Sequence, residues 1–203
     1  MHPGTADIDP QFDTGKMTPL ARKYYESVFL PRYIELQQEI ETTPLAVLVW
    51  GPGKGPGDPY SSSIHEKRMA VRNALLADGY AAIFSEDIDK DSPSKLESLK
   101  TREMAQSLVA DFIVVIVGSA GSIAEVHDFG AFPYDIGSKM LIFVDSRHKD
   151  SYSFAGVLKE LNDLYGNVGE FEYPKDIDEC HLLGKIQQRL KILRLAKWRT
   201  HLR

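Results

Sequence analysis

A turn rich in glycine and serine, followed by one carboxylate, is the part of the sequence whose residue types best suit chemistry. The turn at residues 118–122 follows an apolar run at 112–117, and Glu125 comes three residues later. We expect a buried strand, a tight turn and a helix whose first turn carries Glu125. Glycines let backbone amides approach a ligand, and a helix N-terminus carries a partial positive charge. The candidate ligands of a phosphate or a ribose are Gly118, Ser119, Gly121 and Ser122.

The same turn also fits a purely structural role. Ser122 and Glu125 have the spacing of a capping box, in which two side chains satisfy the free amides at a helix start. The turn is not a Walker loop, because no Gly-Lys-Ser/Thr follows, and it lacks the G-x-G-x-x-G spacing. The pattern alone leaves both interpretations open.

Two more strand-like runs end in polar segments that would share this site. Residues 45–50 precede a glycine-rich loop at 51–59, and residues 80–84 precede an acidic segment at 85–89. Segments that directly follow parallel strands lie at one edge of the sheet, where ligands bind in doubly wound folds. The candidate site residues from these segments are Gly51, Pro52, Gly53, Glu86 and Asp87.

Glu125 suits a reaction in which positive charge develops at an anomeric carbon. Cleavage of an N-glycosidic bond passes through an oxocarbenium-like state, which needs a carboxylate on one face and a proton donor for the leaving base. Asp87 or Glu86 would serve as that donor if burial or neighbouring acids raised its pKa. The alternative for both acids is a solvated loop.

Strand-like and helical patterns alternate along the chain. Strands are expected at 45–50, 80–84, 112–117, 139–144 and 170–173. Helices are expected at 18–41, 64–77 and 92–108, from the turn at 118–122 to about 137 with Glu125 in the first turn, and at 154–165 and 177–198. We therefore predict an α/β fold, a small doubly wound parallel sheet of about five strands with helices on both faces, flavodoxin- or Rossmann-like. Pro31 should break or kink the first helix, and serines 61–63 should cap the second.

Composition narrows the class of protein. The 203 residues carry a formal net charge of -5, which gives no general reason to expect nucleic-acid binding. The single cysteine, Cys180, rules out an internal disulfide and a Cys-based zinc site. His65 and His127 lack a second ligand at helical spacing, so we expect no metal. Without a secretory signal or an apolar run of ~20 residues, the expected location is the cytoplasm.

The sequence predicts a loose leader at the N-terminus and a basic helix at the C-terminus. Residues 1–17 are expected to form a loose leader, and residues 18–203 a single domain with an N-terminal helix and a basic C-terminal helix. One interpretation of the C-terminal helix is that its apolar stripe docks on the domain. The other is a dimer seam, or a contact with nucleic acid or an acidic protein. The stripe consists of Leu182, Ile186, Leu190 and Leu193.

Residues 116–132, IVGSAGSIAEVHDFGAF, resemble the nucleoside 2-deoxyribosyltransferase-like enzymes and look closest to the N-glycosidase effectors of antiphage retron systems. Those effectors carry a Ser-Pro-Gly-Ser turn followed by a Glu and an aromatic residue. Residues 84–87, FSED, are similar to the family's aromatic-Pro-Glu-Asp segment, and residues 45–53 match its strand-then-glycine opening. The chain departs from the pattern at Ser85, at Ala120 and at Val126-His127. The matching turn residues are Ser119, Gly121, Ser122, Glu125 and Phe129.

The resemblance implies a role for each matching position. Glu125 would be the nucleophile or the carboxylate that stabilises the cation, and Asp87 would handle the base or the ribose. The loops at Gly51 and Gly118 would hold the nucleotide, with Phe129 beside them. The expected activity is hydrolysis or transfer at the N-glycosidic bond of a nucleotide or NAD, which is a substrate and not a cofactor.

The expected partners are a second copy of the chain and a defence-system protein or nucleic acid at the basic C-terminal helix, with no membrane. Two alternatives to the N-glycosidase remain. A nucleotide-sensing module without catalysis is suggested by His127, which stands where the family has glycine. A phosphoribohydrolase, whose Pro-Gly-Gly-x-Gly-Thr turn also precedes a Glu, is disfavoured by the single Gly121.

Overall fold

The computed structural model describes residues 14–54, 58–91, 98–130, 135–148, 151, 154–178 and 181–201. The chain divides into two units, Met1–Thr43 and Pro44–Arg203, and each is described by itself. Most of the expected leader, residues 1–13, lies outside the described residues. The assignment of residues 18–203 to a single domain stays a prediction.

The first unit is helical over most of its described length. A 3₁₀ turn, η1 (Thr14–Lys16), precedes α1 (Pro19–Tyr24), the π-helical turn η2 (Tyr25–Phe29) and α2 (Leu30–Glu41). Pro31 does not break this helix. In the wider turn the Leu30 amide bonds to the Tyr25 carbonyl five residues back, which makes room for a residue that donates no hydrogen bond and whose ring needs space.

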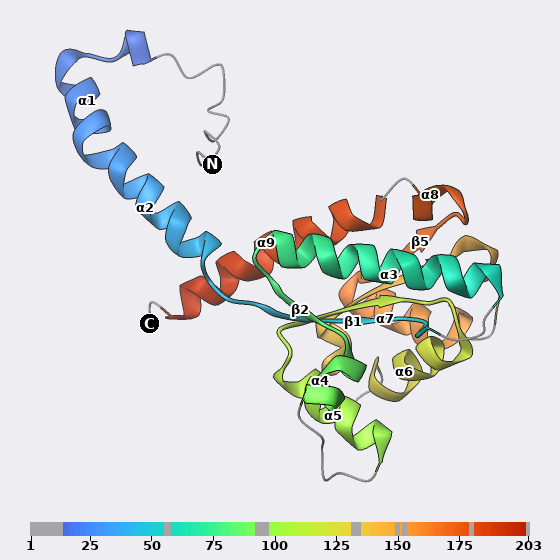
Figure 1. Ribbon diagram of the computed structural model, residues 1–203. Helices are drawn as coiled ribbons and strands as arrows, with labels where there is room; N and C mark the ends of the chain where they lie inside the picture. Colours follow the sequence, from blue (N-terminus) through green and yellow to red (C-terminus); the bar gives the residue numbers. More distant parts are fainter. Residues whose placement is uncertain are drawn as a thin grey trace. The chain divides into compact units, whose positions relative to one another are not determined.

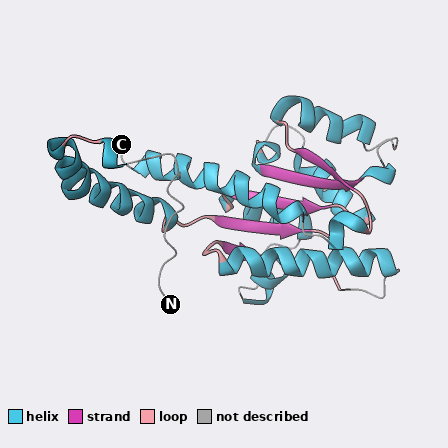
Figure 2. Ribbon diagram, turned by 90° about the horizontal axis from the view of Figure 1, so that it is seen from above, coloured by secondary structure: helices cyan, strands magenta, loops and turns pink. Residues whose placement is uncertain are grey.

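A five-stranded parallel sheet forms the centre of the second unit, in the order β2-β1-β3-β4-β5. The strands are β1 (Ala46–Trp50), β2 (Ala81–Ile83), β3 (Phe112–Ile116), β4 (Met140–Asp145) and β5 (Val168–Phe171). Figure 2 shows them side by side between helices. The predicted fold class is confirmed, and the strand order is the flavodoxin-like one. Only β5 begins clearly earlier than expected.

Helices cover both faces of the sheet, as the alternating side chains of each strand require. Val47 and Val49 join the core beneath α3 (Pro59–Ala77), α8 (Lys175–Asp178) and α9 (His181–His201). Leu48 and Trp50 join the opposite core, with α4 (Ser85–Asp91), α5 (Leu99–Val109), α6 (Ala120–Gly130) and α7 (Lys159–Tyr165). Figure 1 shows α3 and α9 on one side of the sheet and α4 to α6 on the other.

Shorter helical turns are η3 (Ile136–Lys139), η4 (Ser146–His148) and η5 (Phe154–Leu158).

Two helices near the site begin earlier than the sequence suggests. The Asp58 carboxylate accepts the Ser61 amide at 3.0 Å and caps α3, so serines 61–63 lie inside the helix. The acidic segment expected as a loop is helix α4, because Glu86 and Asp87 in its first turn compensate the partial positive charge there. Helix α5 (Leu99–Val109) begins later than the expected 92–94, because Ser98 before it is extended; residues 92–97 lie outside the described residues.

The C-terminal helix α9 docks on its own domain. Leu182, Ile186 and Leu190 are buried in the core beneath α3, and Leu193 packs against it. Lys197 binds Asp111 at 2.8 Å. The first interpretation of the stripe is therefore correct, and the stripe is not a free dimer seam. A partner for the exposed basic residues of α9 stays a prediction.

Across the part of the chain that the structure describes, no helix combines the length and the apolar character needed to cross a membrane.

Candidate functional site

Three polar segments meet at the carboxyl edge of the sheet. β1, β2 and β3 end at Trp50, Ile83 and Ile116, and the turn at Gly51, helix α4 and the turn before α6 follow them. Because β1 lies between β2 and β3, these segments are neighbours at the point where the strand order reverses. The sheet thus brings together the segments that the sequence singled out.

The turn before α6 is closed by two serines. The Ser122 amide donates to the Ser119 hydroxyl at 3.2 Å, and the Ser119 amide donates to the Ser122 hydroxyl at 3.1 Å. The Gly118 amide also donates to the Ser122 hydroxyl. This is a capping box in which Ser119 is the cap and Ser122 the third helical residue. The amides of Gly118, Ser119 and Ser122 are therefore used within the turn.

The capping box of Ser122 and Glu125, one of the two interpretations left open by the sequence, does not form, because α6 begins at Ala120 and not after Ser122. Ser119 takes the capping position, three residues earlier than that pattern suggested. Glu125 consequently lies in the second turn of α6. Its carboxylate does not cap the helix and lines the cavity described below.

Two glycines in this region are required by packing. A Cβ on Gly51, whose φ is +151°, would lie 2.9 Å from the Ile116 carbonyl oxygen. A Cβ on Gly118 would lie 2.8 Å from the Ile64 side chain. Both glycines therefore let β1, β3 and α3 approach closely, which accounts for them without a ligand.

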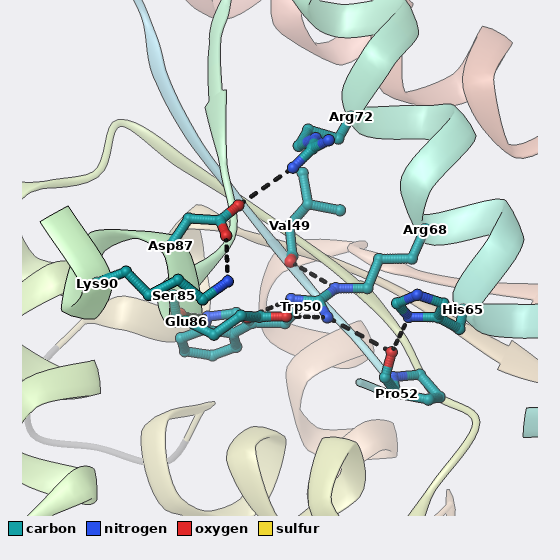
Figure 3. Close-up of polar contacts among 10 residues, drawn as sticks. All are labelled: Val49, Trp50, Pro52, His65, Arg68, Arg72, Ser85, Glu86, Asp87 and Lys90. Atoms are coloured by element: carbon teal, nitrogen blue, oxygen red, sulfur yellow. Dashed lines mark hydrogen bonds and ion pairs between the residues drawn. The ribbon is translucent and has the colours of Figure 1, made fainter. Parts of the chain in front are cut away.

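A buried arginine from α3, Arg68, connects these segments. Its guanidinium donates to both carboxylate oxygens of Glu86, at 2.7 and 2.8 Å, and to the Val49 carbonyl at 2.9 Å. It also lies 4.0 Å from the centre of the Phe84 ring. Figure 3 shows the side chain reaching from α3 across the end of β1 to α4. Arg68 thus fixes the start of α4 against the sheet.

The two acids in the first turn of α4, Glu86 and Asp87, are both ion-paired. Partial burial would raise the pKa of Glu86, but the hydrogen bonds and charge of Arg68 outweigh it and hold that pKa below its ordinary value. Asp87 accepts from Arg72 at 3.1 Å and from Lys90 at 3.0 Å (Figure 3). Glu86 is therefore an ionised partner of Arg68 and does not fit the predicted role of proton donor.

A cavity of about 650 Å³ lies between α3, α4, α5 and α6. It opens at the ends of β1 and β2, and basic and acidic side chains alternate on its walls. This volume is typical of small-molecule sites. The lining residues include Trp50, Gly51, Gly53, Lys54, His65, Arg68, Arg72, Phe84, Ser85, Glu86, Asp87, Asp89, Lys90, Glu103 and Glu125.

The carboxyl of Glu125 is buried in this cavity without a hydrogen-bond partner for one of its two oxygens among the described residues. Its Oε2 atom is buried and accepts no hydrogen bond from the described residues. Burial, and then the negative charge of Glu103, raises the pKa of Glu125 to about 8, although the charge of Arg68 opposes the shift. Burial, followed by the charge of Asp89, also raises the pKa of Glu103. At neutral pH Glu125 is therefore mainly a neutral acid with a proton to give.

The predicted site residues do not all share this cavity. Gly118 and Ser119 line a second one of about 310 Å³, together with Tyr60, Ile123 and other residues that follow β3 and β4. Gly121 is exposed at the start of α6. The turn predicted to bind phosphate and Glu125 thus line two different cavities at the carboxyl edge of the sheet.

Two other predicted binding residues are mainly structural. Phe129 is 1 % exposed and packs against Trp50, with ring centres 5.4 Å apart, so it supports the cavity wall from behind. Pro52 is buried, and its carbonyl lies 2.9 Å from His65 Nδ1. Trp50 itself is held by a 2.7 Å hydrogen bond from its indole nitrogen to the Ser85 hydroxyl.

Sequence reasoning missed Arg68, Arg72 and Glu103. A signal for Arg68 existed, since it falls in the stripe of Ile64, Val71 and Leu75, where the helical period predicts an inward apolar residue. Glu103 has no such signal, because Leu99, one turn before it, is 56 % exposed. Their roles depend on which helices meet at the sheet edge, which the pattern of a single helix does not reveal.

The described ranges hold no cluster of three or more His, Cys, Asp or Glu side chains placed to bind a metal ion. The arginines and lysines on the cavity wall suit an anionic ligand, and the paired acids suit hydroxyl groups. The carboxyl groups on the cavity wall can transfer protons and stabilise positive charge.

The fold and the site define a flavodoxin-like α/β domain with an acid-containing cavity at the switch point of its sheet. The model of a family described as "STM3845 retron effector protein" matches residues 65–201, more than half of the chain, and the chain belongs to this family. The matched range contains Arg68, Glu86, Glu103 and Glu125. Membership links the chain to antiphage defence by retrons. A comparison with curated proteins gives no match.

Proposed function

We propose that this retron effector is a nucleotide N-glycosidase, which breaks the bond between a base and its ribose in the cavity that contains Glu125. The observation that carries the proposal is the carboxyl of Glu125, unpaired at Oε2, with its pKa raised to about 8, in a cavity of nucleotide size. The likeness of the surrounding stretch to nucleoside 2-deoxyribosyltransferase-like enzymes supports the same reaction.

Glu125 acts first as an acid in this proposal. At neutral pH its proton passes to a nitrogen of the leaving base, because a neutral base departs more readily than an anionic one. The carboxylate that remains then faces the positive charge on the anomeric carbon. Its interaction with that charge is strengthened because the carboxyl itself is largely buried. One residue thus supplies both the proton and the counter-charge.

The other walls of the cavity suit the remaining parts of a nucleotide. Lys54, Arg72 and Lys90 lie on the cavity wall and would attract phosphate groups. Asp87, held in place by Arg72 and Lys90, would accept a hydrogen bond from a ribose hydroxyl. The buried rings of Trp50 and Phe84 form an apolar wall at the base of the cavity. Glu103, the second acid with a raised pKa, would orient the attacking water. The Glu125 carboxylate would take the proton that this water loses, which restores the acid for the next cycle.

The experiment is incubation of the purified chain with a panel of nucleosides, nucleotides and NAD, followed by chromatography for free base. We expect base release from at least one nucleotide. Glu125→Gln, which keeps the size and removes the transferable proton, should reduce the rate by ~100-fold or more. Glu160→Gln, an exposed acid on α7, is the matched control and should act as wild type.

Two results would reject the proposal. Absence of base release from every compound would do so, as would equal release by the Glu125→Gln variant. Calorimetric binding of a nucleotide that is returned intact would instead assign a sensing module without catalysis.

A further inference from the structure

Most charged side chains in the larger cavity, of about 650 Å³, are paired with one another. Arg68 binds Glu86 at 2.7 Å, and Asp87 accepts from both Arg72 and Lys90. These pairs bring opposite charges together, and they engage donors and acceptors that a ligand could otherwise use. A charged ligand therefore depends mainly on the charged side chains that lie outside these pairs.

The remaining charged groups of the cavity lie at two separate ends and make no ion pair with a described residue. The acids are Glu103 on α5 and Glu125 on α6, and the basic residues are Lys54, in the loop after β1, and His65 on α3. Figure 1 shows α3 on one side of the sheet and α5 and α6 on the other. Neither basic residue is among the charges that shift the pKa of Glu125. The cavity therefore has a basic end and an acidic end.

The imidazole of His65 is held in one orientation at the basic end. Its Nδ1 atom lies 2.9 Å from the carbonyl oxygen of the buried Pro52, which can only accept, so Nδ1 carries a hydrogen. The same carbonyl accepts from Arg68 at 3.4 Å, and Figure 3 shows both side chains meeting there. Nε2 makes no hydrogen bond with a described residue, and His65 lines the cavity. Nε2 is therefore the ring nitrogen that can meet a ligand.

The turn before α6, where the sequence placed a phosphate, is a poorer candidate for the charged part of a ligand that reacts at Glu125. The amides of Gly118, Ser119 and Ser122 are used to close the turn. Gly118 and Ser119 line the smaller cavity, whereas Glu125 lines the larger one. A ligand in the larger cavity therefore finds its unpaired cationic partners at the basic end.

A phosphate group suits the two basic side chains. The ammonium group of Lys54 offers three donors and a positive charge. A protonated His65 donates from both ring nitrogens, from Nδ1 to Pro52 and from Nε2 to a phosphate oxygen. The negative charge of a phosphate beside the ring favours this protonated form. A nucleoside without phosphate offers no opposite charge to either side chain.

We propose that Lys54 and His65 form a phosphate subsite, through which the cavity selects nucleotides over nucleosides. The phosphate lies at this basic end, and the anomeric carbon and the base lie at Glu125 and Glu103. His65 is the specificity-determining residue, because its ring is fixed before the ligand arrives, whereas Lys54 is exposed. The orientation of the ligand rests on the reaction proposed for Glu125, but the preference for phosphate is a property of binding alone.

Calorimetry of the full-length Glu125→Gln chain, which keeps the ligand intact, tests the subsite. Each common nucleoside is compared with its monophosphate. At least one monophosphate should bind ~10-fold or more tightly than its nucleoside, because hydrogen bonds between charged partners contribute at least this factor. Lys54→Met, made in the same chain, should lower this preference by ~2-fold or more, a smaller effect because Lys54 is exposed.

Two substitutions of His65 separate the role of Nε2 from that of the bond to Pro52. The amide of His65→Asn can take the place of Nδ1 but leaves nothing at Nε2, so the preference for phosphate should fall ~5-fold or more. The affinity for the nucleoside should stay unchanged. The amide of His65→Gln reaches the position of Nε2 and should retain part of the preference. His181→Asn, an exposed histidine at the start of α9, is the control and should keep all of it.

Two results would overturn the proposal. The first is equal affinity for every monophosphate and its nucleoside. The second is a preference for phosphate that His65→Asn leaves unchanged. If Ser119→Ala removed that preference instead, the phosphate would belong to the turn before α6. Because calorimetry needs no turnover, this result is independent of whether the wild type releases a base.

Discussion

Glu125 is unusual because the surrounding residues provide a cavity but no partner. Its neighbour Arg68 is committed to Glu86 through two hydrogen bonds, and only its more distant charge reaches Glu125. Burial and the acid Glu103 therefore dominate, and the proton stays on the carboxyl at neutral pH. A buried carboxyl of this kind costs stability, and such a cost is typical of functional positions.

The cost appears as a dependence of stability on pH. The pKa of Glu125 is raised from 4.5 to about 8, so between these values the unfolded state releases a proton that the folded state retains. The unfolded state binds fewer protons, and folding stability falls as pH rises. Relative to Glu125→Gln, the wild type should lose about 1.4 kcal/mol per pH unit across this window. Urea unfolding at a series of pH values measures the difference, and a constant difference would contradict the assignment.

Arg68 should matter more for stability than any exposed cation nearby. Its side chain is 3 % exposed and bonds to Glu86 and the Val49 carbonyl. Arg68→Met would leave these acceptors without their donor, and we expect a loss of roughly 2–4 kcal/mol in the free energy of unfolding. Lys90→Met removes a cation that is 71 % exposed and should cost less than ~0.5 kcal/mol. Equal losses for the two variants would show that Arg68 does not hold α4.

At the scale of elements, the start of α6 decides where Glu125 points. The reciprocal bonds of Ser119 and Ser122 begin the helix at Ala120, which moves Glu125 into the second turn. A start near Ser122 would have drawn the Glu125 carboxylate back to the turn as a cap. The two serines therefore affect the proposed reaction by setting where α6 begins and where Glu125 lies, and not by binding a ligand.

Two substitutions in this turn should have opposite effects. Ser122→Ala removes the hydroxyl that accepts the Gly118 and Ser119 amides and should destabilise the domain by about 1–2 kcal/mol. Gly121→Ala, whose new Cβ would meet only the Ser119 hydroxyl at 3.7 Å, should stabilise it by about 0.5–1 kcal/mol. Thermal unfolding followed by circular dichroism distinguishes them. A neutral Ser122→Ala would show that the amides find other acceptors.

Sequence patterns predict the elements of this protein better than their ends. Continuous apolar runs predicted β1, β3 and β4, because strands covered on both faces need apolar residues on both. The acidic segment of α4 reads as a loop from sequence, because a helix of seven residues is too short to show an apolar period. Glu125 was identified from its turn. The sequence does not reveal that the charge of Glu103 acts on Glu125, because α5 and α6 come together only in the folded protein.

At the scale of the whole molecule, every residue of the two described core clusters belongs to the second unit. A protein of residues 44–203 should therefore keep its unfolding free energy within about 1 kcal/mol of the full chain, at concentrations where both are monomeric. Denaturation with urea measures this. A loss of several kcal/mol would show that the first unit contributes to the fold of the second.

Membership of a retron effector family gives the whole molecule its context in antiphage defence. The match covers residues 65–201, which include the acids and arginines of the cavity but not α1 and α2. Glu125, the residue that carries the proposed reaction, thus lies within the matched range.

The pH profile of base release is the most direct test of the role given to Glu125. With the nucleotide that the panel identifies, kcat/KM should be highest below pH 8 and fall about tenfold per pH unit above it, as the acid of pKa about 8 loses its proton. The slow residual reaction of Glu125→Gln should lack this decline. A wild-type rate that instead rises through pH 8 would contradict the account, because it would require Glu125 to be ionised before the reaction begins.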